Sequence, residues 1–551
     1  MNGPIQRTRS FRDLLPAGQD WAEAVRAPRR DLVAGLTVAV VALPLALAFG
    51  AASGLGAAAG LATAVIAGAV AAVFGGSNLQ VSGPTGAMTV VLVPIVQRSG
   101  VDGVLLVGVL AGVLLVALAL SRVGRFVHYL PVPVIEGFTA GIAVVIALQQ
   151  VPAALGVSGA HGEQVWAVAA DAVARFLAAP SAAAPVTALA VAAAMLLGAH
   201  WFPRIPFSLL AVAAAVLVAE LAALELPRIG ALPSGLPAPS LGFLDLSAVP
   251  ALLPSALAVA ALAALESLLS ATVADGMTVD QRHDPDRELF GQGLANLAAP
   301  VFGGVPATAA IARTAVNVRS GARSRLAALT HSLVLAVIVL SAADLVGRVP
   351  LAALAGVLLA TTVRMVDLAS LRALLRSTRR DAVVLAVTLV VTVALDLVTA
   401  VVVGLGVAVV LALRSVARSA ELNQEPLTHP GHVGEERGLL AEHIAAYRLD
   451  GPLFFAAAHR FFGELAELGG VRAVVLRMSR VSTVDATGAH VLGDTITALE
   501  RRGVLVLISG ISQGHDQVLS ALGIAEHLRR DGLIFPDTPS AIAHARAVLA
   551  G

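Results

Sequence analysis

The strongest constraint on this sequence is a series of apolar runs that fills residues 32 to about 414. A helix of about 20 predominantly apolar residues is long enough to cross a bilayer. Over the whole chain, 57% of the residues are hydrophobic and 13% are charged, whereas about 25% of the residues of soluble domains are charged. The sequence therefore predicts a polytopic α-helical membrane protein, with spans near 32–50, 56–74, 101–120, 132–150, 183–199, 206–224, 251–274, 326–343, 349–366, 381–396 and 398–414.

Three further segments complete the predicted set of spans. The segments 84–97 and 312–321 are too short to cross a bilayer alone, and 287–303 is less apolar than the other candidates. Counting them gives about 14 segments in a transport domain over residues 31–415. Because this number is even, both termini are expected on the same side of the membrane.

The arginines indicate which side that is. The N-terminal segment, residues 1–30, is polar and lacks the apolar core of a signal peptide. Loops of cytoplasmic sides are enriched in basic residues, which predicts cytoplasmic termini and a location in the cell (inner or plasma) membrane. On the N-terminal side the loops carry Arg122, Arg125, Arg204, Arg282, Arg287, Arg319, Arg323, Arg325, Arg372, Arg376, Arg379 and Arg380, and on the other side Arg98, Arg175, Arg228 and Arg348.

Composition also excludes several classes of function. The chain has no cysteine, which excludes disulfides, thiolate metal sites and a cysteine nucleophile. Its net charge of +1 gives no reason to expect a nucleic-acid partner. The histidines are scattered, without metal-ligand spacing, a phosphate loop or a nucleophile elbow. We therefore predict no enzyme, no catalytic residues, no metal and no organic cofactor.

The character of the sequence changes near residue 415. A polar stretch with two prolines is predicted to be a linker over 416–438, and a soluble domain is predicted over 439–551. "HIAAYRLDG", "PLFFAAA", "RAVVLRM" and "GVLVLIS" have the composition of strands. Helices are predicted at 459–468, 487–501 and 514–523, and this alternation indicates a small α/β domain.

The stretch "GGSNLQVSGPTGAMTVVLVPIV", residues 75–96, interrupts an apolar region. Exposed backbone costs several kcal/mol in hydrocarbon unless it is paired or lines a cavity. Pro84 suits the first position of a helix, which would leave the amides of Thr85, Gly86 and Ala87 as free donors. Gly83 would allow a ligand or another backbone to approach closely.

A second interruption, "FGGVPATAAIARTAVNVRSGARS", covers residues 302–324. Its glycine pair repeats that of the first break at an offset of 228, which relates Thr85 to Arg313. Paired interrupted segments are the best sequence indication of a transporter site. Two half-helix N-termini that meet would form an anion site, and Arg313 would add a positive charge. The alternatives are ordinary helix kinks or loops, and an Arg313 that extends to the lipid headgroups.

Glu266 lies near the middle of the predicted span 251–274. A charge at that depth costs about 2.5–3.5 kcal/mol on insertion scales, so such a residue is by default functional. It could carry a proton. Alternatively, it could hold a cation together with Ser270, which lies one turn later on the same helix face. A structural hydrogen bond to a neighbouring helix is the third possibility.

Motifs along nearly the whole chain occur in one order. They are "DLVAGLTVAVVALPLALAFGAASGL", "VSGPTGAMTVVL", "PVIEGFTAGIAVVIALQQ", "ALESLLSATVADGMT" and "RELFGQGLANLAAPVFGGVPATAAIARTAVNVRSGAR", followed by "YRLDGPLFFAAA" and "VSTVDATGAHVL". Together they resemble the SulP (sulfate permease) family of anion transporters. The last two motifs resemble the STAS domain that follows the membrane part in that family.

The resemblance implies two inverted repeats of seven segments, as in nucleobase transporters, in which a core domain moves against a gate domain. It also implies homodimers. The family's anion site lies between segments three and ten, which correspond here to Thr85, Gly86 and Ala87, and to Ala312 and Arg313. First-span residues near Pro44, namely Leu45 and Phe49, would line the same cavity, and the family's eighth-segment acid corresponds to Glu266.

Two departures from the family affect the expected specificity. Many members have glutamine where this chain has Leu45, which weakens the case for sulfate. Sodium-coupled relatives tend to have a hydroxyl residue near the position of Ile311, so its apolar side chain favours proton coupling. We expect proton-coupled symport of a small anion, such as a dicarboxylate, bicarbonate, sulfate or chloride. The alternatives are an uncoupled exchanger or channel, a sodium-coupled symporter, and a sensor that acts through the STAS domain.

The STAS segment carries one candidate regulatory residue. In related anti-anti-sigma factors a serine or threonine just after an aspartate is phosphorylated, and Thr487 in "VDATG" lies near that position. Thr487 is also a suitable N-cap for the helix that follows, which is the interpretation we favour. The domain is expected to regulate, to dimerise or to bind a cytoplasmic protein partner.

Overall fold

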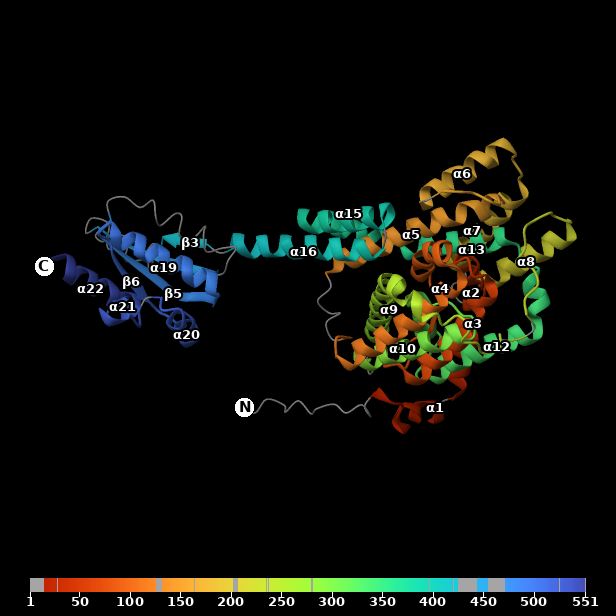
Figure 1. The fold of residues 1–551 in the computed structure, drawn as a ribbon, viewed down its shortest axis with the longest axis horizontal. Coiled ribbons are helices and arrows are strands. Elements are labelled where there is room, and N and C mark those ends of the chain that lie inside the picture. Colours follow the sequence, from red (N-terminus) through yellow and green to blue (C-terminus); the bar gives the residue numbers. More distant parts are fainter. Residues whose placement is uncertain are drawn as a thin grey trace. The chain divides into compact units, whose positions relative to one another are not determined.

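The computed structural model describes residues 14–26, 28–124, 131–162, 164–201, 207–233, 235, 237–278, 281–395, 397–419, 421–424, 443–453, 471–524 and 526–550. The chain divides into two compact units, Met1–Leu405 and Gly406–Gly551, which we describe separately. The first unit is helical and the second contains a β-sheet (Figure 1).

Helices make up almost all of the first unit. After a 3-10 turn at Gly18–Trp21 they are α1 (Ala22–Arg26), α2 (Pro28–Ala52), α3 (Ala57–Phe74), α4 (Gly86–Leu120), α5 (Val132–Leu155), α6 (Val165–Ala178), α7 (Ala183–Trp201), α8 (Phe207–Leu221), α9 (Val249–Gly276), α10 (Pro285–Val301), α11 (Ile311–Arg319), α12 (Leu326–Gly347), α13 (Leu351–Met365), α14 (Leu368–Ser377), α15 (Arg379–Ala394) and α16 (Leu397–Ser419), the last of which continues into the second unit.

Seven stretches of the described residues are long and apolar enough to cross a membrane. They are Pro28–Ala52, Ala57–Phe74, Gly86–Leu120, Val132–Leu155, Leu246–Gly276, Leu326–Gly347 and Leu351–Ser377, and shorter apolar helices lie at Ala183–Gly198, Phe207–Leu221 and Thr399–Arg414. The chain is thus a multi-pass helical membrane protein. The predicted segments 84–97 and 101–120 form one helix, α4, with a non-helical residue at Gly100 (φ 68°). The less apolar segment 287–303 is also helical, as α10.

The spans pack in two groups. The helices α2, α3, α4, α9, α10, α11 and α12 contact one another, as do α5, α7, α8, α13 and α15 (Figure 1). Contacts of α2 with α8 and α13, and of α4 with α5, join the groups. Small residues permit the closest approaches: a Cβ on Gly60 of α3 would lie 2.1 Å from the carbonyl oxygen of Ala46 in α2. Such packing is typical of membrane helices.

The two interrupted segments cross inside the first group. Ser82–Gly83 (β1) and Thr308–Ala309 (β2) form an antiparallel pair in which Ser82 faces Ala309 and Gly83 faces Thr308. The strands satisfy each other's backbone, which removes much of the cost of extended chain at this depth. The two breaks therefore do face each other.

The outer ends of these segments are held by charged side chains. Glu288 accepts hydrogen bonds from the amides of Gly76 (2.9 Å) and Ser77 (3.1 Å). Arg325 donates to the carbonyl of Gly75 at 2.6 Å and to Asn78 at 2.9 Å. Both side chains are almost fully buried. They therefore satisfy the backbone groups that the break after α3 would otherwise leave unpaired.

The described N-terminal residues are attached to the same end of this group. Asp20 accepts two hydrogen bonds from the guanidinium of Arg287 at 2.6 and 3.1 Å. Burial raises the pKa of Asp20, but the hydrogen bonds from Arg287 and from the Ala17 amide outweigh it and hold the pKa below its ordinary value. The pair thus stabilises the fold above the unfolded-state pKa of Asp20, and this contribution is lost as the pH falls through the lowered folded-state pKa.

We expect Asp20→Asn to destabilise the first unit by about 3 kcal/mol, because it leaves the mostly buried Arg287 without its counter-charge. Thermal unfolding of the detergent-solubilised full chain measures this effect at pH 7. The difference from wild type should shrink in acid, as the pH falls from the unfolded-state pKa of Asp20, about 3.9, toward its lowered folded-state pKa. An equally large difference at pH 3 would contradict the ion-pair explanation.

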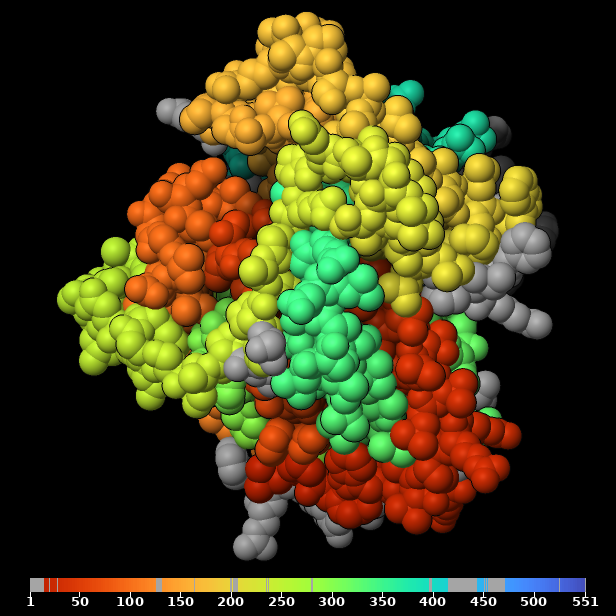
Figure 2. Space-filling view, turned by 90° about the vertical axis from the view of Figure 1, so that its right-hand side faces the viewer, coloured from red at the N-terminus to blue at the C-terminus, as the bar shows by residue number. Residues whose placement is uncertain are grey.

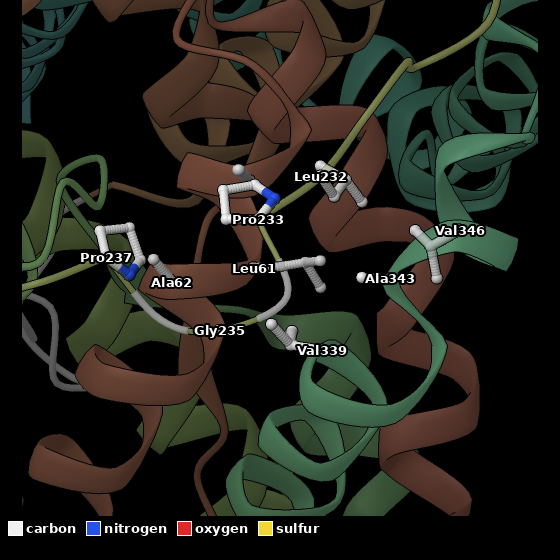
Figure 3. A pocket seen from close by; sticks show the side chains of 10 residues that line it. Leu61, Ala62, Leu232, Pro233, Gly235, Pro237, Val339, Ala343 and Val346 are labelled. Atoms are coloured by element: carbon white, nitrogen blue, oxygen red, sulfur yellow. The ribbon is translucent and has the colours of Figure 1, made fainter.

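The loop between α8 and α9 crosses the face of the first unit that Figure 2 shows. Its amides at Ile229 and Gly230 donate to the carbonyls of Val349 and Gly347, each at 3.1 Å. Figure 3 shows a small pocket between this loop, α3 and α12, lined by Ala58, Leu61, Ala62, Leu232, Pro233, Gly235, Pro237, Val339, Ala343 and Val346. This lining is apolar, so we assign the pocket to packing rather than to anion binding.

The second unit has a five-stranded sheet. Its strands run in the order β3 (Glu421–Gln424), β4 (Ile444–Leu453), β5 (Ala473–Val484), β6 (Leu505–Ser509) and β7 (Ile534–Phe535), with β3 antiparallel to β4 and the other neighbours parallel. The helices are α19 (Ala486–Arg501), α20 (Gln513–Ala521), α21 (Glu526–Arg530) and α22 (Thr538–Ala550).

Three sequence predictions for this unit change. The strand β3 lies inside the predicted linker 416–438. The segment "HIAAYRLDG" and the start of "PLFFAAA" form one strand, β4, while residues 454–470, with the predicted helix 459–468, lie outside the described residues. The N-cap of α19 is Asp485, which accepts a hydrogen bond from the amide of Gly488 at 2.7 Å. The predicted cap at Thr487 is therefore wrong, and Thr487 is an exposed residue of the first turn.

Candidate anion site

The first half-helix starts two residues later than predicted. Its N-cap is Thr85, whose extended backbone (φ −129°, ψ 162°) precedes the first helical residue, Gly86. The hydroxyl of Thr85 accepts a hydrogen bond from the amide of Met88 at 3.4 Å. Pro84 therefore precedes the cap and is not the first helical residue. The donors that the helix leaves for a ligand are the amides of Gly86 and Ala87.

The second half-helix, α11, has Ala310 as its N-cap, without a side-chain cap. Thr85 and Ala310 are therefore the equivalent positions, at an offset of 225. The predicted offset of 228, which relates Thr85 to Arg313, is wrong by three residues. The first helical residues are Ile311, 40% exposed, and Ala312, also exposed. The end of α11 thus presents uncapped amides on an accessible surface.

Glu266 of α9 joins the two segments. Its Oε2 accepts hydrogen bonds from the hydroxyl of Thr85 at 2.8 Å and from that of Thr308 at 2.7 Å. One hydroxyl precedes each half-helix, so the carboxylate lies at the crossing itself. Glu266 therefore lies between the starts of the two half-helices, and its location beside an anion site stays a prediction. Because Glu266 is half-buried, it can exchange a proton or contact an ion.

Thr308 is a site residue that the sequence reasoning missed. The extended part of the second segment, where a hydroxyl residue is expected, does not include Ile311, because Ile311 is already helical. The extended part is β2, and Thr308 is its first residue. The argument against a sodium site that rested on Ile311 therefore fails. The available signal was the threonine in "PATAAI", directly before the predicted half-helix.

Ser270 does not contact Glu266 through any hydrogen bond of the described residues. Instead it donates to the hydroxyl of Thr314 at 3.0 Å, and that hydroxyl accepts from the amide of Val81 at 3.2 Å. Ser270 is fully buried. Ser270 thus helps to fix α11 and the first extended segment to α9, and its cooperation with Glu266 around one cation stays a prediction.

Arg313 has a different orientation from the one predicted. The residue is 2% exposed, although it follows the exposed Ala312. Its Nη2 donates to the carbonyl of Pro84 at 2.7 Å. Nη1 lies so close to Gly83 that a Cβ there would be 2.6 Å away. Nε and Nη1 have no hydrogen-bond partner among the described residues. The charge therefore lies against the backbone of the crossing, within electrostatic range of Glu266.

Apolar side chains cover the end of α4. A Cβ on Gly86 would meet the side chain of Ile146 at 2.3 Å and that of Phe49 at 3.1 Å. Phe49 belongs to the first span, as predicted, whereas Ile146 belongs to α5 in the other helix group and was not predicted. Leu45 is buried in the same hydrophobic cluster as Phe49 and Ala87. The surroundings of the Gly86 amide are thus apolar, which strengthens electrostatic interactions there.

A polar stripe on α10 fixes both extended segments. Gln292 donates to the hydroxyl of Ser82 at 2.6 Å. One turn later, Asn296 accepts from the amide of Ala307 at 2.8 Å and donates to its carbonyl at 2.9 Å. Both side chains are completely buried. They hold the strands so that the two half-helices start at the same place.

We expect Asn296→Ala to destabilise the protein by about 2–4 kcal/mol, since it leaves a buried amide and a buried carbonyl of Ala307 unpaired. The measurement is thermal unfolding, with anion binding determined separately on the folded protein. Thr187→Ala is the control, because that hydroxyl bonds only within its own helix. A stability within 0.5 kcal/mol of wild type would show that Asn296 does not hold β2.

The described residues contain no group of three or more His, Cys, Asp or Glu that could hold a metal ion. A coupling cation at the crossing would therefore be bound by Glu266 and the hydroxyl oxygens of Thr85 and Thr308. These are oxygen ligands, which hard cations prefer. The same carboxylate can instead take up a proton.

Comparison with known proteins identifies the family. Residues 29–388 match the model of the "Sulfate permease family", and residues 440–541 match the STAS domain. The chain belongs to the sulfate permease family. It is 36% identical over 504 residues to "Putative sulfate transporter YvdB" of Bacillus subtilis, covering 90% of this chain and 94% of that protein. It is 30% identical to "Bicarbonate transporter BicA" of a Picosynechococcus, covering 88% and 89%.

Solved structures support the fold of this family member. The murine anion transporter Slc26a9, in its inward-facing state, has a TM-score of 0.83 with 19% identity, covering 99% of this chain and 96% of that chain. At this identity the likeness concerns the fold alone. The predicted membrane fold with a C-terminal STAS domain, and the resemblance on which it rested, are confirmed, and the chain is an anion transporter of this family.

Proposed function

We propose that this protein is a secondary active transporter of small anions, and that the half-helix N-termini at Gly86 and Ile311 bind the anion. The observation that carries this proposal is the antiparallel pairing of β1 and β2, which brings both N-termini to Glu266. Alternating access would follow from movement of one helix group against the other. The relatives of this chain include a protein named as a putative sulfate transporter and one named as a bicarbonate transporter, which agrees with a small anion as the substrate.

The charges at the crossing suggest how coupling depends on the anion. Each helix N-terminus carries about half a positive charge, Arg313 adds one, and ionised Glu266 removes one. The sum is about +1 with Glu266 ionised and about +2 with Glu266 protonated. A buried site costs least when its total charge is near zero. We therefore propose that a monovalent anion binds to the site while Glu266 is ionised. A divalent anion would bind while Glu266 is protonated and would be transported together with that proton.

Sodium coupling is the second candidate. It is favoured by the hydroxyls of Thr85 and Thr308, which lie 2.8 and 2.7 Å from the carboxylate oxygen and could turn their oxygens toward a cation. A sodium ion there would have the same effect on the total charge as a proton. The two candidates differ in the ion gradient that drives uptake of a divalent anion.

Transport by the reconstituted full chain tests the proposal. We expect uptake of labelled sulfate into proteoliposomes to rise when the side from which sulfate enters is acidified, and uptake of labelled chloride to change little. Stimulation of sulfate uptake by a sodium gradient at constant pH would replace proton with sodium coupling. Absence of uptake or exchange of both anions would contradict anion transport through this site.

Several finer expectations stay predictions. They are cytoplasmic termini, a homodimer, a protein partner of the STAS domain, and regulation at Thr487. The exposure of Thr487 in the first turn of α19 is compatible with modification. Phosphate there would also be stabilised by the positive end of the helix dipole.

A further inference from the structure

The short helix α14 is an exposed element of the second helix group. It lies between α13 and α15, and none of its residues is buried. The hydroxyl of Ser370 donates to Glu136, in the second turn of α5, at 3.1 Å. The helix α13 forms the first part of the candidate span Leu351–Ser377, and α15 overlaps the span that the sequence predicts at 381–396. We therefore place α14 where the chain turns at the bilayer surface, on the side where α5 begins.

The exposed face of α14 combines leucines and arginines. Leu368 and Leu375 are 58% and 52% exposed, and Arg372 and Arg376 are exposed as well. Residues at spacings of four, seven and eight lie on neighbouring parts of one helix surface. Such a surface fits the boundary between acyl chains and headgroups, where leucines enter the apolar layer and arginines reach the phosphates.

Helix stability explains Arg376, which lies in the last turn of α14 at the negative end of the helix dipole, but not the arginine that begins α15. The ten residues of α14 include two arginines and no acid. The next helix, α15, begins with the exposed Arg379. A cation in the first turn of a helix opposes the helix dipole, and Asp381, in the same turn, balances only one of the two arginines Arg379 and Arg380. An external anion at this place would balance the other.

The surface helix α6, on the opposite side of the membrane, provides a comparison within the same molecule. It also exposes apolar side chains, with Trp166 at 55% and Leu177 at 71%. Its two charged residues, Asp171 and Arg175, form an ion pair of 2.7 Å, so α6 is neutral. Apolar exposure is thus common to both surface helices, whereas net positive charge occurs only on α14.

We propose that α14 and Arg379 form a binding site for the headgroup of an anionic phospholipid of the surrounding leaflet. The guanidinium groups of Arg372, Arg376 and Arg379 would bind the phosphate, which arginine can do through paired hydrogen bonds. Leu368 and Leu375 would contact the start of the acyl chains. Because α14 contacts α5 and α15, bound lipid stabilises the second helix group.

Titration of the detergent-solubilised full chain with phosphatidylglycerol, and separately with phosphatidylcholine, tests this site. Thermal unfolding and lipid retention in native mass spectrometry give the apparent affinities. An arginine near an anionic lipid contributes about a fivefold gain in affinity (about 1 kcal/mol). We expect Arg372→Gln/Arg376→Gln to weaken phosphatidylglycerol binding about 25-fold and to leave phosphatidylcholine binding unchanged. Arg372→Lys/Arg376→Lys should keep most of the affinity.

The matched control is Arg501→Gln/Arg530→Gln, which removes two exposed charges from α19 and α21 of the other unit. It should bind phosphatidylglycerol as wild type does. Unchanged binding by the α14 glutamine variant, or an equal loss in the control, would overturn the proposal. Displacement of the lipid by inorganic phosphate or soluble glycerol phosphate at equal concentration would also overturn it, because the surface would then bind soluble anions. Unaltered thermal midpoints without added lipid verify that the variants are folded.

Discussion

Replacing Glu266 with glutamine is expected to abolish the dependence of sulfate uptake on pH. In the wild type, uptake should rise roughly tenfold for each pH unit of acidification while Glu266 is mostly ionised, since only the protonated fraction binds the divalent anion. Glutamine has the charge of the protonated acid at every pH. The variant should therefore take up sulfate at a rate that the pH gradient does not alter. The measurement is initial uptake into proteoliposomes at several external pH values.

Two further variants identify the group responsible. Glu266→Asp keeps a carboxylate and should keep the pH dependence, although its shorter side chain should weaken the contacts with Thr85 and Thr308. Glu136→Gln removes a carboxylate that lies at the start of α5, away from the crossing, and should behave as wild type. If Glu266→Gln retained the tenfold response, another group would carry the proton and the assignment of Glu266 would be wrong.

Replacing Arg313 with glutamine is expected to weaken chloride binding about a hundredfold. A unit charge about 5–6 Å from the anion contributes about 3 kcal/mol at an effective dielectric constant of about 20. Because the guanidinium is 2% exposed and pairs with a backbone carbonyl, its effect on the anion is expected through the electric field and not through contact. Chloride-dependent thermal stabilisation of the purified protein measures the affinity.

A double variant separates this electrostatic role from a structural one. Arg313→Gln/Glu266→Gln removes one charge of each sign and restores the total charge of the wild-type site. It should therefore recover at least tenfold in chloride affinity over Arg313→Gln. If the double variant binds chloride no better than the single one, the loss comes from the broken hydrogen bond to Pro84, and the charge account of the site is wrong.

The sequence located both interrupted segments but not the residues at which they become helical. Glycine pairs and Pro84 indicated the breaks, and Glu266 was identified because a carboxylate inside an apolar span is costly. The start of each half-helix depends on where β1 and β2 pair, which involves residues more than 200 positions apart. The same tertiary pairing decided that Thr308, and not a residue near Ile311, shares Glu266 with Thr85.

The sequence also did not predict which of two neighbouring side chains is exposed and which is buried. Arg313 and Ala312 are adjacent in a segment predicted to face the anion, yet Ala312 is exposed and Arg313 is buried. Helical geometry turns successive residues by about 100°, so an error of a single residue in the start of α11 changes which side chain is exposed at its end. Asn296 and Gln292 could not be assigned either, because their partners are backbone groups and a hydroxyl of other segments.

By itself, the sequence determined that the chain spans a membrane, that two of its segments are broken, and that the C-terminal part is a separate α/β domain. These features follow from hydrophobicity, from glycine and proline, and from strand and helix periodicity, all of which are local. The tertiary structure decided the site. It set the register of the crossing, buried Arg313 against Pro84 and placed two hydroxyls on Glu266, because those arrangements depend on which distant backbone groups must be paired where water is absent.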